Sequence, residues 1–128
     1  MTLQNNSKKF FAIASLLMAL AIALGAFGAH GLKSIVSVDM LKVYNTGVEY
    51  HFYNTLGLFA LSIFLNFKEN SKKLIVACWL IVVGTLIFSV SLYLLVILNM
   101  PILGAITPIG GTLLIISWLL VTYSILKD

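Results

Sequence analysis

Four apolar stretches separated by short polar segments dominate the hydrophobic pattern of the chain. They cover residues 10–29, 47–67, 74–98 and 102–126. A helix needs roughly 20 apolar residues to cross about 30 Å of hydrocarbon, and each stretch is long enough. A membrane β-barrel would instead show alternating segments of about ten residues, and these stretches do not alternate. The pattern predicts an all-α fold, an integral membrane four-helix bundle in which residues 1–128 form one four-span transmembrane domain.

The connection between the first two spans, residues 30–46, is longer than the others and has an apolar face. The residues that give it this face are Leu32, Ile35, Val36, Met40, Leu41 and Tyr44. Serine is a residue type that caps helix N-termini, so Ser37 predicts a helix that starts at Val38. We expect a short amphipathic helix that lies at the membrane interface and leads into the second span. The polar segment 68–73 predicts a tight turn between the second and third spans.

The composition supports a membrane location. Of the 128 residues, 61% are hydrophobic and only 9% are charged, whereas a soluble domain has about 25% charged residues. The mean hydropathy of +1.09 agrees with this assignment. The single cysteine, Cys78, excludes an intramolecular disulfide, and its apolar surroundings predict an inert, packed thiol.

The lysines predict the orientation of the spans. Six of them would lie on one side of the membrane, namely Lys8, Lys9, Lys68, Lys72, Lys73 and Lys127. Lys33 and Lys42 would lie on the other side, partly offset by Asp39. Cytoplasmic loops are enriched in lysine and arginine, so we predict a multi-pass protein with both termini in the cytoplasm. The net charge of +4, placed in this way, suits anionic lipid rather than nucleic acid.

Small residues are expected where helices pack closely, because in lipid the approach of backbones matters more than the burial of apolar surface. The end of the first span carries such residues around a histidine, in the stretch GAFGAHGLK at residues 25–33. It predicts a packing seam that ends where glycine terminates the helix. The predicted packing residues are Ala21, Gly25, Gly28, Ala29, Gly84, Gly110 and Gly111. His30 then either bonds loose carbonyls at the interface or handles a proton or a ligand.

The opening of the second span, GVEYHFYNT, places several polar groups in an apolar stretch. On a helix Gly47, either Tyr50 or His51, and Asn54 share one face, and Glu49 points elsewhere. Ionisable groups at membrane depth usually face protein or water. Glu49 lies near the interface, where it either pairs with a lysine or histidine or takes part in function.

Hydroxyl groups line one side of the third span. Thr85, Ser89 and Tyr93 recur at intervals of four, and Ser91 lies on a neighbouring face. Hydroxyls in membrane helices often bond their own backbone or a neighbouring helix. A structural role is therefore the simplest interpretation of this stripe.

A proline divides the fourth span, where Thr107 is followed by Pro108. This pair suits an N-cap and a first helical position, so the helix is predicted to restart at Pro108. The alternative is a continuous helix from Ile102 that Pro108 kinks.

Antiparallel spans would bring these polar groups together in the outer half of the bundle. We predict a ligand-binding or structural polar cluster of His30, Glu49, His51, Asn54, Ser89, Ser91, Tyr93 and Thr107. His30 and Glu49 flank the same connection, so they are expected to make the closest contact. No catalytic residue, metal ligand or cofactor is assigned, because the chain has no HExxH zinc motif, nucleophile elbow or phosphate loop.

The order of these stretches resembles a small family of bacterial membrane proteins, the domain of unknown function 423 family, which is related to eukaryotic transmembrane protein 256. The resemblance rests on GAFGAHGLK, on Tyr50 and His51 with Asn54, on FSVSLY, and on TPIGG followed by Ser117 and Trp118. It covers nearly the whole chain and implies a four-helix protein of the bacterial inner (cytoplasmic) membrane. Two positions depart from the family pattern, in which histidine is common in place of Asn54 and glycine in place of Ser117.

Three functions remain open. The first is a non-enzymatic membrane protein that packs as a homo-oligomer or with another membrane protein, and a closed outer half would favour it. The second is a small transporter or channel, which requires a hydrated path through both halves. The third is an enzyme acting on a lipid or quinone with His30, Glu49 and His51 as acid and base groups, and a lateral opening beside the histidines would favour it. We prefer the non-enzymatic function, with the lipid bilayer as the principal partner.

Overall fold

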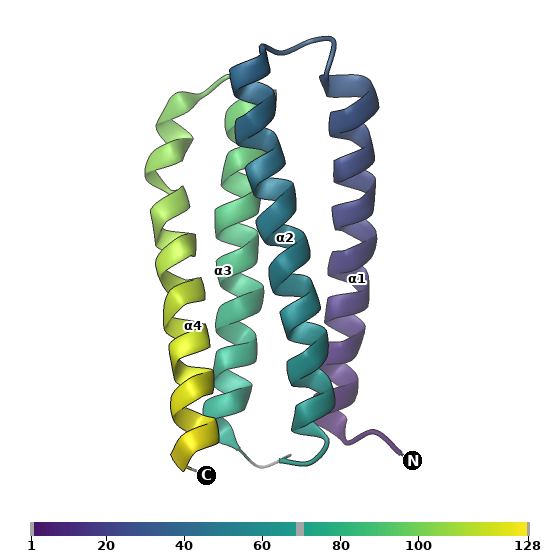
Figure 1. Ribbon diagram of the computed structural model, residues 1–128, viewed down its shortest axis with the longest axis vertical. Helices are drawn as coiled ribbons and strands as arrows, with labels where there is room; N and C mark the ends of the chain where they lie inside the picture. The colour runs from purple at the N-terminus through teal and green to yellow at the C-terminus, as the bar shows by residue number, and fades with distance from the viewer. Residues whose placement is uncertain (1, 69–70, 128) are drawn as a thin grey trace.

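The computed structural model describes residues 2–68 and 71–127, which form four antiparallel α-helices (Figure 1). These are α1 (Asn5–Phe27), α2 (Val38–Leu65), α3 (Lys72–Ile97) and α4 (Thr107–Lys127). A π-helical turn, η1 (Gly28–Leu32), extends α1, and a 3-10 turn, η2 (Pro101–Ala105), precedes α4. Both chain termini lie at one end of the bundle, here called the terminal end, and η1 and η2 lie at the opposite, far end (Figure 1). The predicted all-α four-helix bundle is confirmed.

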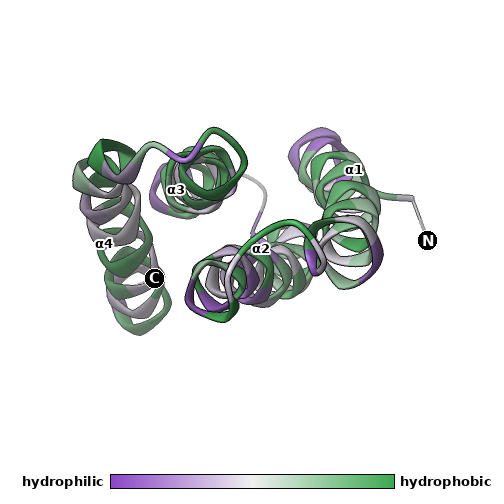
Figure 2. Ribbon diagram, turned by 90° about the horizontal axis from the view of Figure 1, so that it is seen from above, coloured by the Kyte–Doolittle hydropathy of each residue, from purple (hydrophilic) through white to green (hydrophobic). Residues whose placement is uncertain are grey.

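Each helix packs against the next one along the chain. Seen along the bundle, α2 and α3 lie in the middle, with α1 and α4 on opposite sides of them (Figure 2). α4 follows α3 closely but stands apart from α2, so the four helices do not close into a square. This arrangement leaves a groove between α2 and α4, with α3 as its floor.

Three helical segments of the described chain are long and apolar enough to cross a membrane, namely Asn5–Leu32, Lys72–Ile97 and Pro101–Lys127. α2, which carries the second predicted span, falls outside this criterion of length and composition. Polar side chains in the middle of α2, among them His51 and Asn54, lower its hydropathy. α2 nevertheless runs beside α1 and α3 over most of their length (Figure 1).

The predicted separate amphipathic helix before the second span is absent from the described residues, because α2 is one uninterrupted helix of 28 residues from Val38. The predicted cap is confirmed, since the Ser37 hydroxyl accepts a hydrogen bond from the Met40 amide at 3.2 Å. No proline lies within Val38–Leu65, so the helix continues through both predicted segments. Of the predicted turn at 68–73, residues 69–70 lie outside the described residues.

Glycine does not terminate α1 as predicted. Gly28 has φ −60° and opens the π-helical turn η1, and no glycine of the described chain has a positive φ. The Tyr44 ring of α2 packs against this turn so closely that a Cβ on Gly28 would lie 2.5 Å from its Cε1 atom. The Tyr44 hydroxyl donates to the Leu24 carbonyl. The absence of a side chain at Gly28 therefore allows the Tyr44 ring to pack closely. It does not serve a left-handed backbone conformation.

The boundary between α3 and α4 matches the predicted restart. Asn99, with φ 52°, follows the end of α3 in the left-handed conformation, and the Met100 amide donates to the Leu95 carbonyl at 2.9 Å. This pattern is the Schellman ending of a helix. After η2, α4 begins at Thr107, one residue before the predicted Pro108, so the alternative of a continuous kinked helix is wrong.

Apolar side chains fill the interior in two clusters. The cluster near the terminal end contains Phe10, Leu58 and Ile81, which are fully buried, and the cluster near the far end contains Tyr44 and Leu92. Buried polar side chains of α2 and α3 lie between the two clusters and are here called the polar layer. Its members are His51, Asn54, Thr55, Thr85 and Ser89.

Glycines set the spacing of α3 and α4. A Cβ on Gly110 would lie 2.3 Å from the Phe88 amide nitrogen and 2.8 Å from the Gly84 carbonyl oxygen, so the two backbones touch there. Gly111 is less confined, since its nearest neighbour is the Phe88 ring at 3.5 Å. The seam predicted along α1 differs from the structure, because Ala29 is exposed. Of the other residues of that seam, Ala21 is fully buried and Gly25 is half-buried.

Candidate functional site

His51 of the polar layer is bonded to Tyr93 of the neighbouring apolar cluster. The His51 Nδ1 atom and the Tyr93 hydroxyl are 2.9 Å apart, and only 4% and 3% of these residues' surfaces are exposed. Beside them, the Ser89 hydroxyl donates to the Gly47 carbonyl at 2.7 Å. Both bonds join α2 to α3. Three of the predicted site residues are thus brought together by this helix pair.

Ser91 and Thr107 form a second, separate pair at the start of α4. Their hydroxyl oxygens are 2.6 Å apart, and the Ser91 hydroxyl also donates to the Phe88 carbonyl at 2.8 Å. A hydroxyl has one hydrogen to donate, so Thr107 is the donor to Ser91. This pair fastens the first turn of α4 to α3.

His30 and Glu49 do not join the predicted cluster. Both side chains are exposed, and no hydrogen bond or ion pair connects either of them to the described part of the chain. Glu49 lies two residues, or about 200° around the helix, from both Gly47 and His51, whose side of α2 is buried. It therefore points away from α3. The expected contact between His30 and Glu49 is wrong, because each lies on the outer side of its own helix.

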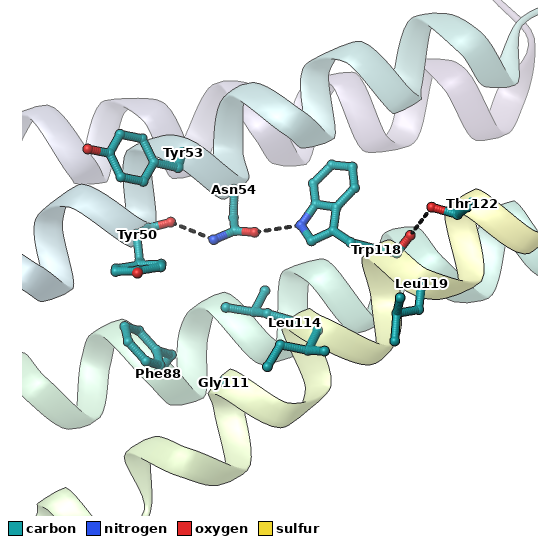
Figure 3. A pocket seen from close by; sticks show the side chains of 10 residues that line it. Tyr50, Tyr53, Asn54, Phe88, Gly111, Leu114, Trp118, Leu119 and Thr122 are labelled. Atoms are coloured by element: carbon teal, nitrogen blue, oxygen red, sulfur yellow. Dashed lines mark hydrogen bonds between the residues drawn. The ribbon is translucent and has the colours of Figure 1, made fainter.

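Asn54 faces α4 rather than the other predicted residues. Its Nδ2 atom donates to the Tyr50 carbonyl and its Oδ1 atom accepts from the Trp118 Nε1–H, both at 2.9 Å (Figure 3). The Trp118 ring lies against Gly57, where a Cβ would be 2.4 Å from the Cζ2 atom of the indole. Gly57 and Trp118 were not predicted as site residues. The signals available for this contact were a glycine in the same helix as the polar stretch and the presence of Trp118 among the residues that carry the family resemblance.

The groove between α2 and α4 has a volume of about 750 Å³. Its lining residues come from α2, α3 and α4 and are Tyr50, Tyr53, Asn54, Phe88, Gly111, Leu114, Ile115, Trp118, Leu119 and Thr122. The Tyr50 ring packs on Phe88 with centroids 5.0 Å apart. Figure 3 shows Trp118 reaching across from α4 toward Asn54. The groove thus has aromatic rings from α2 and α3 toward the far end and aliphatic side chains of α4 on both sides of Trp118.

The polar groups of the groove are hydrogen-bond donors without charge. The hydroxyls of Tyr50 and Tyr53, which are 44% and 60% exposed, have no hydrogen-bond partner among residues 2–68 and 71–127. Asn54 retains one N–H beyond the bond to Tyr50. The lining contains no carboxylate, imidazole, thiol or ammonium group, and the described residues hold no group of three or more side chains that would bind a metal. The groove is therefore suited to a neutral acceptor group attached to an apolar body.

Comparisons with known proteins place this architecture in a family. The model of a family described as protein of unknown function, DUF423, matches residues 24–111. The chain is 41% identical over 120 residues to the UPF0382 membrane protein YwdK of Bacillus subtilis, covering 94% of this chain and 98% of that protein. UPF0382 membrane proteins of Staphylococcus saprophyticus and Haemophilus influenzae are 38% and 36% identical over the same share of this chain, covering 98% and 95% of their own lengths. No solved structure matches the chain.

Proposed function

The chain belongs to the DUF423 family of small membrane proteins, and from this premise we propose that it binds one glycerolipid in the groove between α2 and α4 without catalysing a reaction. The groove is the observation that carries the proposal. It combines an apolar body with a polar end, which is the chemistry of a membrane lipid.

The length of the groove suits an acyl chain lying along the helices. Its α4 wall runs from Gly111 to Thr122, which at 1.5 Å per residue is about 16 Å. Leu114, Ile115 and Leu119 line this wall. An acyl chain that enters from the far end would contact them in turn.

The polar end of the groove suits the ester region of a glycerolipid. Tyr50 and Tyr53 lie toward the far end, and their hydroxyls are available to donate to ester carbonyls. Tyrosine is enriched where the hydrocarbon meets the headgroups. Asn54 adds a third donor one turn deeper. The head of the lipid would therefore sit at the far end and its chain would extend toward the terminal end.

The same chemistry favours binding over catalysis. An enzyme acting on a lipid would need acid and base groups beside the groove, whereas the ionisable side chains of its lining are tyrosines. His51 turns instead toward α3, where Tyr93 bonds it. The lateral opening is thus separated from the histidine that the enzymatic hypothesis requires.

The proposal includes four crossings of a bacterial inner membrane with both termini in the cytoplasm. α2 lies beside two helices that are apolar enough to cross, and six lysines lie at the terminal end. In a Cys78→Ala background, a cysteine at Ser34 should react with an impermeant thiol reagent in intact cells, and a cysteine at Thr2 should be protected. Labelling at position 2 alone would reverse the orientation.

Lipid retention tests the groove directly. The protein is purified in mild detergent from nanodiscs of dioleoylphosphatidylglycerol, and bound lipid is counted by native mass spectrometry. We expect about one lipid per chain in the wild type and several-fold less in Tyr50→Phe/Tyr53→Phe, which removes only the two donors. Tyr123→Phe, an exposed α4 tyrosine outside the groove, should retain lipid as the wild type does. Equal lipid retention in all three proteins would refute the proposal. So would recovery of the wild-type protein as a dimer without bound lipid.

A further inference from the structure

Three polar atoms in the polar layer are buried without a hydrogen-bond partner among the described residues. They are His51 Nε2, Thr55 Oγ1 and Thr85 Oγ1. The residues that carry them are 4%, 0% and 1% exposed. Buried polar groups in folded proteins nearly always have a partner, either in the protein or in ordered water. Three such groups in two adjacent helices therefore require an explanation that the groove does not supply.

The register of α2 and α3 places these atoms within about one helical turn of one another. The hydroxyl of Ser89 bonds the carbonyl of Gly47, so these two residues lie at one depth. One turn closer to the terminal end, α2 carries His51 and α3 carries Thr85, because the helices are antiparallel. Thr55 follows His51 by one further turn on the same face of α2.

α1 closes this region from the other side. The Leu17 backbone of α1 lies within reach of the His51 ring as a hydrogen-bond partner, but it does not meet the distance and angle of a hydrogen bond to Nε2. The Nδ1 atom of the ring is already hydrogen-bonded to the Tyr93 hydroxyl. The second ring nitrogen, Nε2, is therefore buried between α1, α2 and α3 without a partner in hydrogen-bond geometry.

We propose that an internal water site lies here, in which one or two ordered water molecules join His51 Nε2, Thr55 Oγ1 and Thr85 Oγ1. A buried water makes two to four hydrogen bonds, and the three side chains together with the Leu17 carbonyl offer four. The set suits water better than an ion, because it contains no carboxylate to balance a cation and no ammonium or guanidinium to balance an anion. Tyr93, His51 and the water then form one hydrogen-bonded chain in the middle of the bundle.

Replacing the threonines by valine tests the proposal through the sign of the effect. Thr55→Val and Thr85→Val keep the shape of the side chain and remove the hydroxyl. If water occupies the site, each variant strips a partner from it and lowers the thermal unfolding midpoint in detergent by several degrees. If the region is dry, valine relieves an unpaired hydroxyl and the midpoint rises. Thr112→Val is the matched control, because that exposed hydroxyl bonds only its own helix at the Pro108 carbonyl.

A second measurement observes the ring itself and needs no variant of the site. In a His30→Gln background, His51 is the only imidazole, and solid-state NMR of protein labelled with ¹⁵N-histidine in nanodiscs should show a cross-peak between its ring and water. This protein remains testable even if the valine variants do not fold. An unchanged or higher midpoint for both valine variants, or a His51 ring without a water cross-peak, overturns the proposal.

Discussion

α4 meets its two neighbours in opposite ways. Against α3 it lies in backbone contact, because Gly84 and Gly110 have no side chains to separate the helices. Against α2 it stands away, and Trp118 reaches across the gap to Asn54 and Gly57. One helix thus forms a tight interface on one side and a wall of an open groove on the other. The comparison teaches that side-chain size at a few positions, rather than overall hydrophobicity, sets helix spacing in this protein.

The largest expected effect is at the tight interface. Gly110→Ala places a Cβ 2.3 Å from the Phe88 amide nitrogen. Relieving this contact requires the backbones of α3 and α4 to separate. We expect a loss of about 3 kcal/mol or more in the free energy of unfolding, above the usual range for overpacking. Thermal or denaturant unfolding in detergent measures it. Gly111→Ala is the control, since its nearest neighbour is a ring at 3.5 Å, and an equal loss in both variants would contradict the backbone contact.

A smaller effect is expected at the wide interface. Gly57→Ala places a Cβ 2.4 Å from the Trp118 ring, but a side chain can turn away. We expect a loss of about 1–2 kcal/mol, from mild overpacking and from the weakened bond between Trp118 and Asn54. In a Trp79→Phe background, Trp118 fluorescence should shift as the indole leaves its site.

Gly104→Ala provides the comparison for this variant, because the nearest atom there is Leu95 Cδ1 at an ordinary 3.4 Å. If Gly57→Ala leaves the Trp118 emission unchanged, the indole does not bridge α2 and α4.

The smallest effects are expected at His30 and Glu49, two of the exposed ionisable residues near the far end. His30→Gln and Glu49→Gln should each change the free energy of unfolding by less than about 0.5 kcal/mol, as is usual for exposed positions. They should also leave lipid retention unchanged, because neither residue lines the groove. If both variants lowered the free energy of unfolding by more than about 1 kcal/mol, the result would support the polar cluster predicted from the sequence.

The partial success of that predicted cluster has a geometric cause. His51, Ser89 and Tyr93 were grouped by their common depth, and in the structure they do lie together. His30 and Glu49 lie at the same end of the bundle but are exposed. Depth follows from counting residues along a helix, whereas the direction of a side chain depends on how the helix is rotated against its neighbours.

The sequence by itself determined the class of protein, the number of helices and most of their ends. These features depend on local signals: the apolar stretches, the Ser37 cap and the pair Thr107 and Pro108. The incorrect division of α2 into a short helix and a span that begins at Gly47 has the same local origin. The amphipathic residues before Gly47 and the polar residues after it suggested two segments, but nothing between Val38 and Leu65 breaks the helix.

Only the tertiary structure decided which residues share a site. His51 and Asn54 are three residues apart, yet one bonds Tyr93 of α3 and the other bonds Trp118 of α4. A soluble helix reveals its inner face by an apolar stripe, but membrane helices are apolar on every side, so the pattern along one helix does not show which neighbour it faces. The groove arises from Trp118 and Gly57, which are 61 positions apart in the chain. Its existence depends on the packing of helices that no local stretch of sequence specifies.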